Sequence, residues 1–499
     1  MLNNHLKKWS RTISCALFCS WLTGNALFAQ DINEAWVKAN YTKREEMIPM
    51  RDGAHLYTAI YEPIHSQKPS PILFTRTPYK AAPYGETMSN RLWRSWQKYA
   101  REKYIFVIQD VRGRWKSEGE FINVRPFVSE KEKNGKIDEA SDVYDTAEWL
   151  IYHTRNNNGN IGIIGSSYSG FYSLMGALSA HPAIKAAVPQ APVTDWFMGD
   201  DYHHNGAFML CDGFRFVSSM NRPRPIPTEQ STPATPYYKT DEYSFFLKMG
   251  TLKNLTRLLG DSILYWNELM THPNYDSWWQ ERDTRRNCYK IKPAILIVGG
   301  LFDAEDCFGT WELYKAIQRQ SPDTQLELIM GPWYHGAWGG TDGSYLGNIQ
   351  FGANTVLYYQ DQIEFPFLQY YLNREGEKTP DSQKVHIFFS GENQWKTFSS
   401  WPSKEAKEML VKLTDWMIRL ISKLSDEQIQ DMLRSEHGGL NETFADVAAI
   451  TGDKRYLKLA HQFSHQTVLQ PLLKQEDKLT GMHANTQIPK VIGFKRIAD

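Results

Sequence analysis

A serine in a glycine-rich turn is the first residue that could do chemistry. Residues 165–170 read GSSYSG, directly after a β-like run and at the start of a helical one. A nucleophile on such a strained turn needs a glycine two residues earlier, where a Cβ would clash with the following helix. Ser167 has Gly165 at that position, whereas Ser166 would have Ile164. We therefore predict that Ser167 is a nucleophile, although Ser169 stands where the G-x-S-x-G pattern has its second glycine. The alternative is a turn that only connects strand to helix.

An acid and a histidine follow later β-like runs in the chain order of a Ser-Asp-His triad. Asp303 comes after the run AILIVGG (294–300), and His335 comes after LELIMGP (326–332). In this interpretation His335 takes the proton of Ser167, and Asp303 holds the imidazole in the required tautomer. Each residue alone could be an ordinary loop former. Three of them at strand ends favour a catalytic role.

The oxyanion of an acyl-transfer reaction needs two hydrogen-bond donors. The backbone N–H of Tyr168, the residue after the nucleophile, supplies one by its position. The second should come from the loop after the early strand, and this loop reads RTPYK (76–80), without a glycine-rich turn. The hydroxyl of Tyr79 is therefore the candidate donor, with surface packing as the alternative.

Acidic residues are crowded around the predicted triad. The stretch DAED (303–306) places three acids within four residues, which is more negative charge than one imidazole requires. A cationic group on the substrate would explain the surplus, since a unit charge pair at 4 Å is worth about 1 kcal/mol in water and about 4 at an effective dielectric of 20. Metal binding is the alternative, but no histidine has ligand spacing here. We expect no metal and no cofactor.

Short β-like runs alternate with helical stretches from about residue 41 to 328, which predicts an α/β fold. The expected strands are 56–61, 72–75, 104–109, 161–164, 184–189, 294–298 and 326–330. Residues 195–292 break the alternation, and we expect them to form an inserted helical cap over the carboxyl edge of the sheet, where ligands bind in such folds. Four cap aromatics could line an acyl pocket or only form the core of the cap: Trp196, Phe197, Tyr202 and Phe208.

The N-terminus has the pattern of a secretory signal peptide. Three basic residues precede an apolar run over 13–28, and the sequence turns polar at Gln30. We expect residues 1–29 to be removed by cleavage after Ala29, or alternatively after Ala26, and the protein to be periplasmic or secreted. An uncleaved membrane anchor is the other interpretation.

Composition excludes several classes of function. The 499 residues include 56 basic and 56 acidic side chains. The chain therefore has no net charge that would favour binding to nucleic acid or, after signal cleavage, to a membrane surface. Five cysteines are too few and too scattered for a disulfide scaffold. The expected partners are a small-molecule or short-peptide substrate and, in a homo-oligomer, further copies of the chain.

Several motifs together resemble the X-Pro dipeptidyl-peptidase/CocE-NonD family of serine hydrolases. These are RTPY (76–79), QDVRGR (109–114), SEGEF (117–121), DTAEW (145–149), GSSYSG (165–170) and GPWYH (331–335). The likeness runs from about residue 33 to 402. Within the family, WFMGDDYHHNG (196–206) and FDAEDCFG (302–309) are most similar to the α-amino acid ester hydrolases. The resemblance implies an α/β-hydrolase domain over about 30–380.

The resemblance also implies roles for particular residues. It implies the triad Ser167, Asp303 and His335, and an oxyanion hole completed by Tyr79. It further implies a carboxylate cluster for the substrate's α-ammonium group, made of Asp201, Glu305 and Asp306. We expect cleavage of esters or amides of α-amino acids through an acyl-enzyme. The alternatives are an X-Pro dipeptidyl-peptidase, a β-lactam (glutaryl-7-ACA type) acylase or a general carboxylesterase.

The C-terminal part of the chain resembles something else. Residues 381–403 resemble only the start of the β jelly roll that follows the catalytic domain in this family. Residues 404–499 resemble an internal piece of the β-L-arabinofuranosidase-type glycoside hydrolases, whose catalytic domain is an (α/α)6 barrel. The motifs that carry this resemblance are SEHGGLNE (435–442), ITGDK (450–454) and DKLTGMHANTQIP (477–489). The resemblance implies that zinc-binding and nucleophilic cysteines would be needed for glycosidase activity. No cysteine follows Cys307, so we predict no such activity from this part of the chain. We expect a fusion of two truncated genes, or an assembly error, with a seam near 403–408. An inactive or carbohydrate-related fusion product is the alternative of another class.

Overall fold

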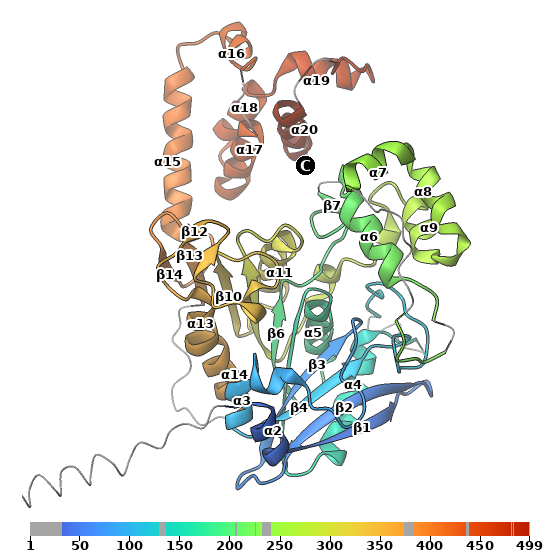
Figure 1. The fold of residues 1–499 in the computed structure, drawn as a ribbon. Helices are drawn as coiled ribbons and strands as arrows, with labels where there is room; N and C mark the ends of the chain where they lie inside the picture. Colours follow the sequence, from blue (N-terminus) through green and yellow to red (C-terminus); the bar gives the residue numbers. More distant parts are fainter. Residues whose placement is uncertain are drawn as a thin grey trace, which may run out of the picture. The chain divides into compact units, whose positions relative to one another are not determined.

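The computed structural model describes residues 32–128, 136–204, 207–224, 226–231, 241–373, 384–435, 439–480, 482 and 484–498. The chain divides into two compact units, Met1–Thr397 and Phe398–Asp499, which are described separately (Figure 1). The predicted signal peptide lies outside the described residues. Within those ranges, no helix is both long and apolar enough to cross a membrane.

A ten-stranded sheet forms the centre of the first unit, in the order β1-β2-β4-β3-β5-β6-β9-β10-β13-β14. Neighbouring strands from β4 to β13 are parallel, while β1 and β2 pair antiparallel at one edge. The bounds are β1 Tyr41–Pro49, β2 His55–Pro63, β3 Ser70–Thr77, β4 Ile105–Asp110, β5 Asn157–Ser166, β6 Ile184–Gln190, β9 Ala294–Gly300, β10 Leu326–Gly331, β13 Val385–Phe389 and β14 Gln394–Phe398. All seven predicted strands are present, so the α/β class is confirmed.

Burial on both faces explains why these strands could be recognised in the sequence. Every residue of β3, β4 and β9 is buried, and buried parallel strands read as continuous apolar runs. β1, with the sequence YTKREEMIP, was not predicted. It is charged because it lies at the edge of the sheet and pairs with β2 alone, so only part of it is buried.

Helices cover both faces of the sheet (Figure 1). A Cβ at Gly162 would meet Leu372 of α14 (Phe365–Asn373), whereas the neighbouring Ile163 contacts Gly176 of α5 (Tyr168–Leu178). Because successive strand residues point to opposite faces, α14 and α5 lie on opposite sides. Other helices of this unit are α2 Glu34–Asn40, α3 Gln97–Arg101, α4 Glu139–His153, α11 Cys307–Gln320, α12 Ala337–Gly340 and α13 Thr355–Tyr359.

The insertion between β6 and β9 is helical, as predicted. Its helices are α6 Leu210–Met220, α7 Glu242–Met249, α8 Leu252–Leu259, α9 Leu264–Thr271 and α10 Ser277–Gln280. α7 and α8 are separate helices, because Gly250 ends α7 with a φ of 71°.

The stretch 384–397, predicted as the start of a separate jelly roll, instead extends the central sheet. β13 pairs in parallel with β10, with Val385 opposite Leu328. Val385, Ile387 and Phe388 are buried, and the ring of Phe388 lies 5.4 Å from that of Phe351. The apolar residues of this strand are therefore covered by the first unit itself.

The second unit is all-helical, as predicted, with α15 Lys404–Ile421, α16 Asp426–Met432, α17 Leu440–Thr451, α18 Lys454–Gln462, α19 Gln466–Leu473 and α20 Ala484–Ala498. Its small core contains Ile421, Ile429, Phe444, Leu459 and Phe463. Ser425 starts α16 with a capping box, in which its side chain and that of Gln428 satisfy each other's backbone N–H groups.

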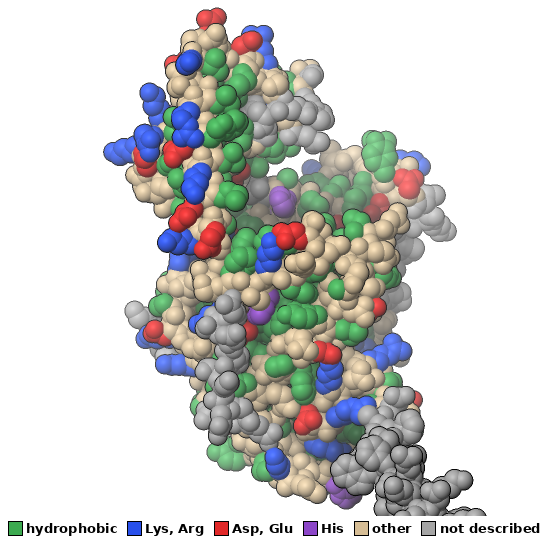
Figure 2. Space-filling model, turned by 90° about the vertical axis from the view of Figure 1, so that its left-hand side faces the viewer, with side chains coloured by type: hydrophobic (Ala, Val, Ile, Leu, Met, Phe, Trp, Pro, Cys, Tyr) green, Lys and Arg blue, Asp and Glu red, His purple; other side chains and the backbone are tan. Residues whose placement is uncertain are grey.

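On the face shown in Figure 2, acidic and basic side chains are interspersed, in keeping with the balanced composition.

Candidate active site

Ser167 stands at a sharp turn between β5 and α5. Its backbone has φ 62° and ψ −125°, a strained conformation for a residue with a side chain. A Cβ at Gly165 would lie 2.3 Å from the carbonyl oxygen of Ser169, which confirms why a glycine is needed there. A Cβ at Gly170 would lie 2.6 Å from the carbonyl oxygen of Gln190 on β6. Gly170 therefore allows close packing between α5 and β6, one position later than in the strict motif.

Asp303 and His335 meet across two neighbouring strands. Gly300 of β9 is opposite Gly331 of β10, so the loops that follow them lie side by side. Nδ1 of His335 is 2.9 Å from Oδ2 of Asp303. The other oxygen of Asp303 accepts the backbone N–H groups of Glu305 (2.8 Å) and Asp306 (3.0 Å). The carboxylate is thus held in place by its own loop while it orients the imidazole.

Ser167 lies beside Tyr79. Burial raises the pKa of Tyr79, and the nearby side chain of Ser167 lowers it in part. Among the contacts of the described residues there is no hydrogen bond between Ser167 and His335, and Nε2 of His335 instead lies 3.4 Å from Oε2 of Glu305. Catalytic hydrogen bonds are often long or misaligned when no substrate is bound.

The loop that carries Tyr79 is fixed by buried polar groups. The carbonyl oxygen of Pro78 accepts hydrogen bonds from Arg114 (3.1 Å) and from Trp115 (2.9 Å). A carboxylate oxygen of Asp110 accepts the N–H of Ala81 at 2.7 Å. Desolvation raises the pKa of Tyr79, so its hydroxyl keeps its proton and can donate it to a hydrogen bond.

The structure brings the three other predicted acids close to His335. Asp201 has a positive φ of 43°, and its N–H donates to the carbonyl oxygen of Glu305 at 3.0 Å. Its carboxylate accepts from Nε1 of Trp196 at 2.7 Å. Burial, together with the negative charges of Glu305 and Asp303, raises the pKa of Asp201. Oδ2 of Asp306 lies 3.9 Å from Nδ1 of His335.

Asp306 is fully buried, and neither of its carboxylate oxygens has a hydrogen-bond partner among the described residues. Burial and the charges of Asp201 and Asp200 raise its pKa well above the usual range. Within the described ranges, no Lys or Arg forms an ion pair with Asp201 or Asp306. A buried carboxylate without a partner is costly, and a cation would offset that cost.

Asp200, the buried neighbour of Asp201, was not predicted from the sequence. One of its oxygens accepts the N–H groups of Thr194 (2.8 Å) and Asp195 (2.9 Å). The other accepts the N–H of Gly309 at 2.7 Å, near the start of α11. Asp200 thus ties the cap entrance to the loop of Glu305 and Asp306. No spacing in the sequence distinguishes it from Asp201.

Other candidate residues are structural. Trp196, Phe197 and Tyr202 are buried, and the ring of Trp196 packs edge-on against Tyr168 at 5.5 Å. They form the core of the cap. His203 bonds the carbonyl oxygen of Trp196 at 2.9 Å, and burial lowers its pKa. Burial raises the pKa of Cys307 to about 11, which keeps its thiol protonated.

Comparisons with known proteins show which families the two parts of the chain match. The family model of the X-Pro dipeptidyl-peptidases (S15 family) matches residues 52–337, more than half of the chain. A second model, the GH127 catalytic domain of β-L-arabinofuranosidases, matches residues 398–499. Both resemblances found in the sequence are therefore confirmed.

Individual relatives show the same likeness. An aminopeptidase from a Thaumarchaeota archaeon is 34% identical, with a TM-score of 0.66 over 73% of this chain and 60% of that one. An α-amino acid ester hydrolase is 33% identical, with a TM-score of 0.66 over 76% of this chain and 62% of that one.

Cocaine esterase of Rhodococcus sp. (strain MB1 Bresler) is 24% identical over 73% of this chain and 61% of the relative. The chain thus spans about three fifths of the length of these relatives. On the strength of the family match, the chain belongs to the X-Pro dipeptidyl-peptidase (S15) family of hydrolases.

Proposed function

We propose that the first unit is a serine hydrolase that cleaves esters and amides of α-amino acids through an acyl-enzyme and prefers substrates with a free α-amine. The supporting observation is the arrangement of acids around His335. Three carboxylates lie within 4 Å of its ring nitrogens, at 2.9, 3.4 and 3.9 Å, and that of Asp306 has no hydrogen-bond partner of its own. One carboxylate suffices to orient an imidazole, so the others are available to a cation.

The reaction begins when the hydroxyl of Ser167 turns from Tyr79 towards His335. Nε2 of His335 accepts its proton as the oxygen attacks the substrate carbonyl. The resulting oxyanion receives hydrogen bonds from the hydroxyl of Tyr79 and from the N–H of Tyr168, which as the first N–H of α5 has no intrahelical acceptor. His335 then protonates the leaving group, and water hydrolyses the acyl-enzyme by the reverse sequence of proton transfers.

The substrate amine would lie among the acids because it is attached one carbon from the reacting carbonyl. A carbonyl placed at Ser167 therefore brings the ammonium close to His335, where Asp201, Glu305 and Asp306 lie. A protonated amine can donate to the unpaired oxygens of Asp306 and neutralise the mutual repulsion of these acids.

The test compares phenylglycine methyl ester with its analogue lacking the amine, using the full chain. We expect kcat/KM to favour the amine by at least about tenfold, and Asp306→Asn to remove most of that preference. Circular dichroism confirms that the variant is folded. Equal rates on both esters would overturn the proposed amine preference. Faster turnover of Ala-Pro-anilide than of the ester would favour the dipeptidyl-peptidase alternative.

The oxyanion role of Tyr79 predicts that Tyr79→Phe lowers kcat by about a hundred- to a thousandfold, because one donor is lost while the ring remains. Steady-state rates on phenylglycine methyl ester measure the effect. Tyr84→Phe is the matched control: its hydroxyl bonds Asp110 at 2.7 Å in the same loop without reaching Ser167. A loss in Tyr79→Phe no larger than in the control would exclude the oxyanion role.

The charges around His335 also predict a pH dependence. Burial disfavours the imidazolium, but the hydrogen bond to Asp303 and the charges of Asp303, Glu305 and Asp201 outweigh it, so the pKa of His335 is raised. The general base must be neutral, so kcat/KM should rise with pH through a value above the usual 6.5. Glu305→Gln removes one negative charge and should move this acidic limb to lower pH.

The substrate for that measurement is the ester without the amine, so that amine binding does not contribute. Glu312→Gln, on α11 and paired with Lys315 at 2.6 Å, serves as the matched control. An acidic limb that stays in place in Glu305→Gln, or moves to higher pH, would contradict the assignment of His335 as the base.

We also infer that the chain is exported, on the basis of the basic and apolar residues that precede Gln30. N-terminal sequencing of the protein recovered from the periplasm or medium tests this. A mature N-terminus at Gln30 or at Leu27 is the expected result, and an intact N-terminus in the cytoplasm would contradict it.

A further inference from the structure

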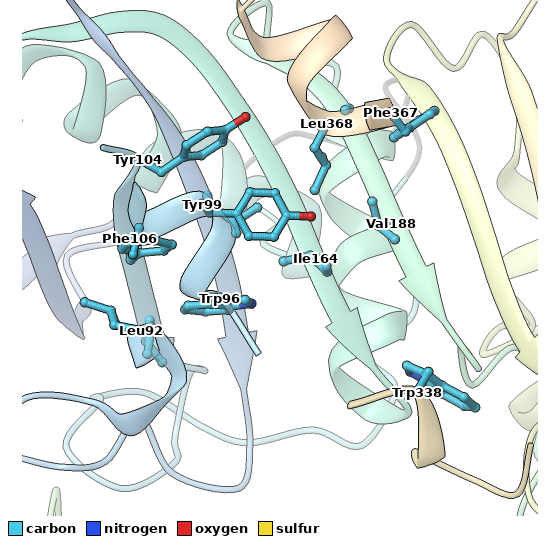
Figure 3. Packing of buried hydrophobic residues seen from close by; sticks show 14 of the residues in the cluster. Leu92, Trp96, Tyr99, Tyr104, Phe106, Ile164, Val188, Trp338, Phe367 and Leu368 are labelled. Carbon is cyan, nitrogen blue, oxygen red and sulfur yellow. The ribbon is translucent and has the colours of Figure 1, made fainter. Parts of the chain in front are cut away.

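A cavity of about 450 Å³ opens beside the nucleophile turn. Its wall includes Tyr79 and Gly165, together with Trp96, Ile164 and Trp338, which Figure 3 shows on one face of the sheet. This is the face covered by α14, because Ile164 is two residues from Gly162 and points the same way. None of Asp201, Glu305 and Asp306 lines the cavity. It is therefore separate from the acid cluster.

The unpaired charges of this cavity are positive. Arg91, on the 3-10 helix Asn90–Trp93, and Arg94 directly after it both line the wall. The guanidinium of Arg91 lies over the ring of Trp96 at 5.4 Å. Within the part of the chain that the structure describes, neither guanidinium has a hydrogen bond or an ion pair.

The other charged groups of the wall already have partners. Glu364 accepts hydrogen bonds from Tyr99 and from Gln190, both at 2.9 Å, and from Tyr359. Lys80 donates to the carbonyl oxygen of Glu229 at 2.9 Å. The guanidinium groups of Arg91 and Arg94 are thus free for an anionic ligand, and the planar fork of arginine matches a carboxylate.

Residues next to the triad, though not Ser167 or His335 themselves, form part of the cavity wall. Tyr79, which lies beside Ser167, forms part of the wall, and the ring of Trp338 is centred 6.1 Å from that of His335. The leaving atom must come close to His335, because it takes a proton from Nε2 as its bond to the carbonyl carbon breaks. The rest of the leaving group can then extend past Trp338 into the cavity.

We propose that this cavity binds the leaving group of the substrate and that Arg91 and Arg94 hold a carboxylate on it. The inference rests on the proposed function and narrows its substrate class. The preferred substrate has an ammonium group on the acyl side of the cleaved bond and a carboxylate on the leaving side, as in a dipeptide. Hydrolysis consumes one water, and the leaving amine takes the proton that His335 received from Ser167.

The test uses the full chain with the dipeptide Phe-Phe and with its C-terminal amide, which differ only in the carboxylate. We expect kcat/KM to favour the free acid by about tenfold, equivalent to about 1.4 kcal/mol. In the double variant Arg91→Gln/Arg94→Gln the ratio should fall to about one. Arg91→Lys/Arg94→Lys should keep part of it, since the charge remains.

Arg319→Gln is the matched control. Arg319 is exposed near the end of α11, roughly 18 Å along the helix from its start, and should leave the ratio as it is. Circular dichroism and thermal unfolding of each variant show whether it is folded. The ratio is taken within one protein, so a general loss of activity does not affect it.

The outcomes separate this inference from the proposed function. If phenylglycine methyl ester is cleaved with amine preference but the dipeptide and its amide are cleaved equally, the leaving-group site is wrong and the hydrolase proposal stands. If the acid is preferred and the double glutamine variant keeps that preference, the arginines are not the cause. If neither dipeptide nor ester is cleaved, the proposed function itself fails.

Discussion

Ser167→Ala is expected to lower kcat on phenylglycine methyl ester by about four to six orders of magnitude, because alanine cannot form the acyl-enzyme. The strained backbone at φ 62° and the flanking Gly165 and Gly170 remain, so the fold is retained. The residual rate comes from the oxyanion donors and from binding alone. Initial rates at high enzyme concentration measure the residual activity, and circular dichroism shows whether the fold is retained.

Ser166→Ala is the control for this experiment. Ser166 ends β5 one residue before the turn and has Ile164, not glycine, two positions earlier. We expect this variant to keep at least about a tenth of the activity. If Ser166→Ala is the inactive variant and Ser167→Ala is not, the assignment of the nucleophile is wrong.

Asp303→Asn is expected to lower kcat by about 10⁴-fold. Asparagine keeps the oxygen that accepts the N–H groups of Glu305 and Asp306, so the loop should stay in place. It turns an NH2 group towards Nδ1 of His335, at the position where the carboxylate oxygen now lies 2.9 Å away. The imidazole then carries its proton on Nε2 and cannot accept one from Ser167. Steady-state kinetics measure the loss of activity, and thermal unfolding distinguishes a wrong imidazole tautomer from a loss of structure.

Asp306→Asn provides the contrast. Asp303→Asn should slow the ester with the amine and the ester without it by the same factor, because it acts on the base. Asp306→Asn should slow mainly the ester with the amine. A drop of less than about tenfold in Asp303→Asn, with the fold intact, would show that Asp303 does not orient His335.

The core of the fold was predictable because its strands are buried on both faces. The runs that became β3, β4 and β9 are buried along their whole length and mostly apolar. The ends of β5, β9 and β10 placed Ser167, Asp303 and His335 at one edge of the sheet. β1 was not predictable, since an edge strand with one partner can be as charged as YTKREEMIP. The segment that forms β13 was assigned to another domain, because the local sequence does not determine that it pairs with β10.

The site was predictable in its residues but not in its contacts. The types and order of Ser167, Asp303 and His335 follow from the turn and the strand ends. Three features depend on how loops from different strands meet: the 3.4 Å approach of Glu305 to Nε2, the unpaired carboxylate of Asp306 and the placement of Tyr79 beside Ser167. Arg91 and Arg94 carry no motif, and only their place on a cavity wall distinguishes them from other surface arginines.

The central claim is that Ser167 forms an acyl-enzyme with an α-amino acid, and mass spectrometry after rapid acid quenching tests it directly. The full chain is mixed with phenylglycine p-nitrophenyl ester, quenched, digested and mapped. The account predicts one phenylglycyl group on Ser167 in the peptide that contains residues 165–170, and no such adduct in Ser167→Ala. Turnover without any adduct on Ser167, or with the adduct on another residue, would contradict it.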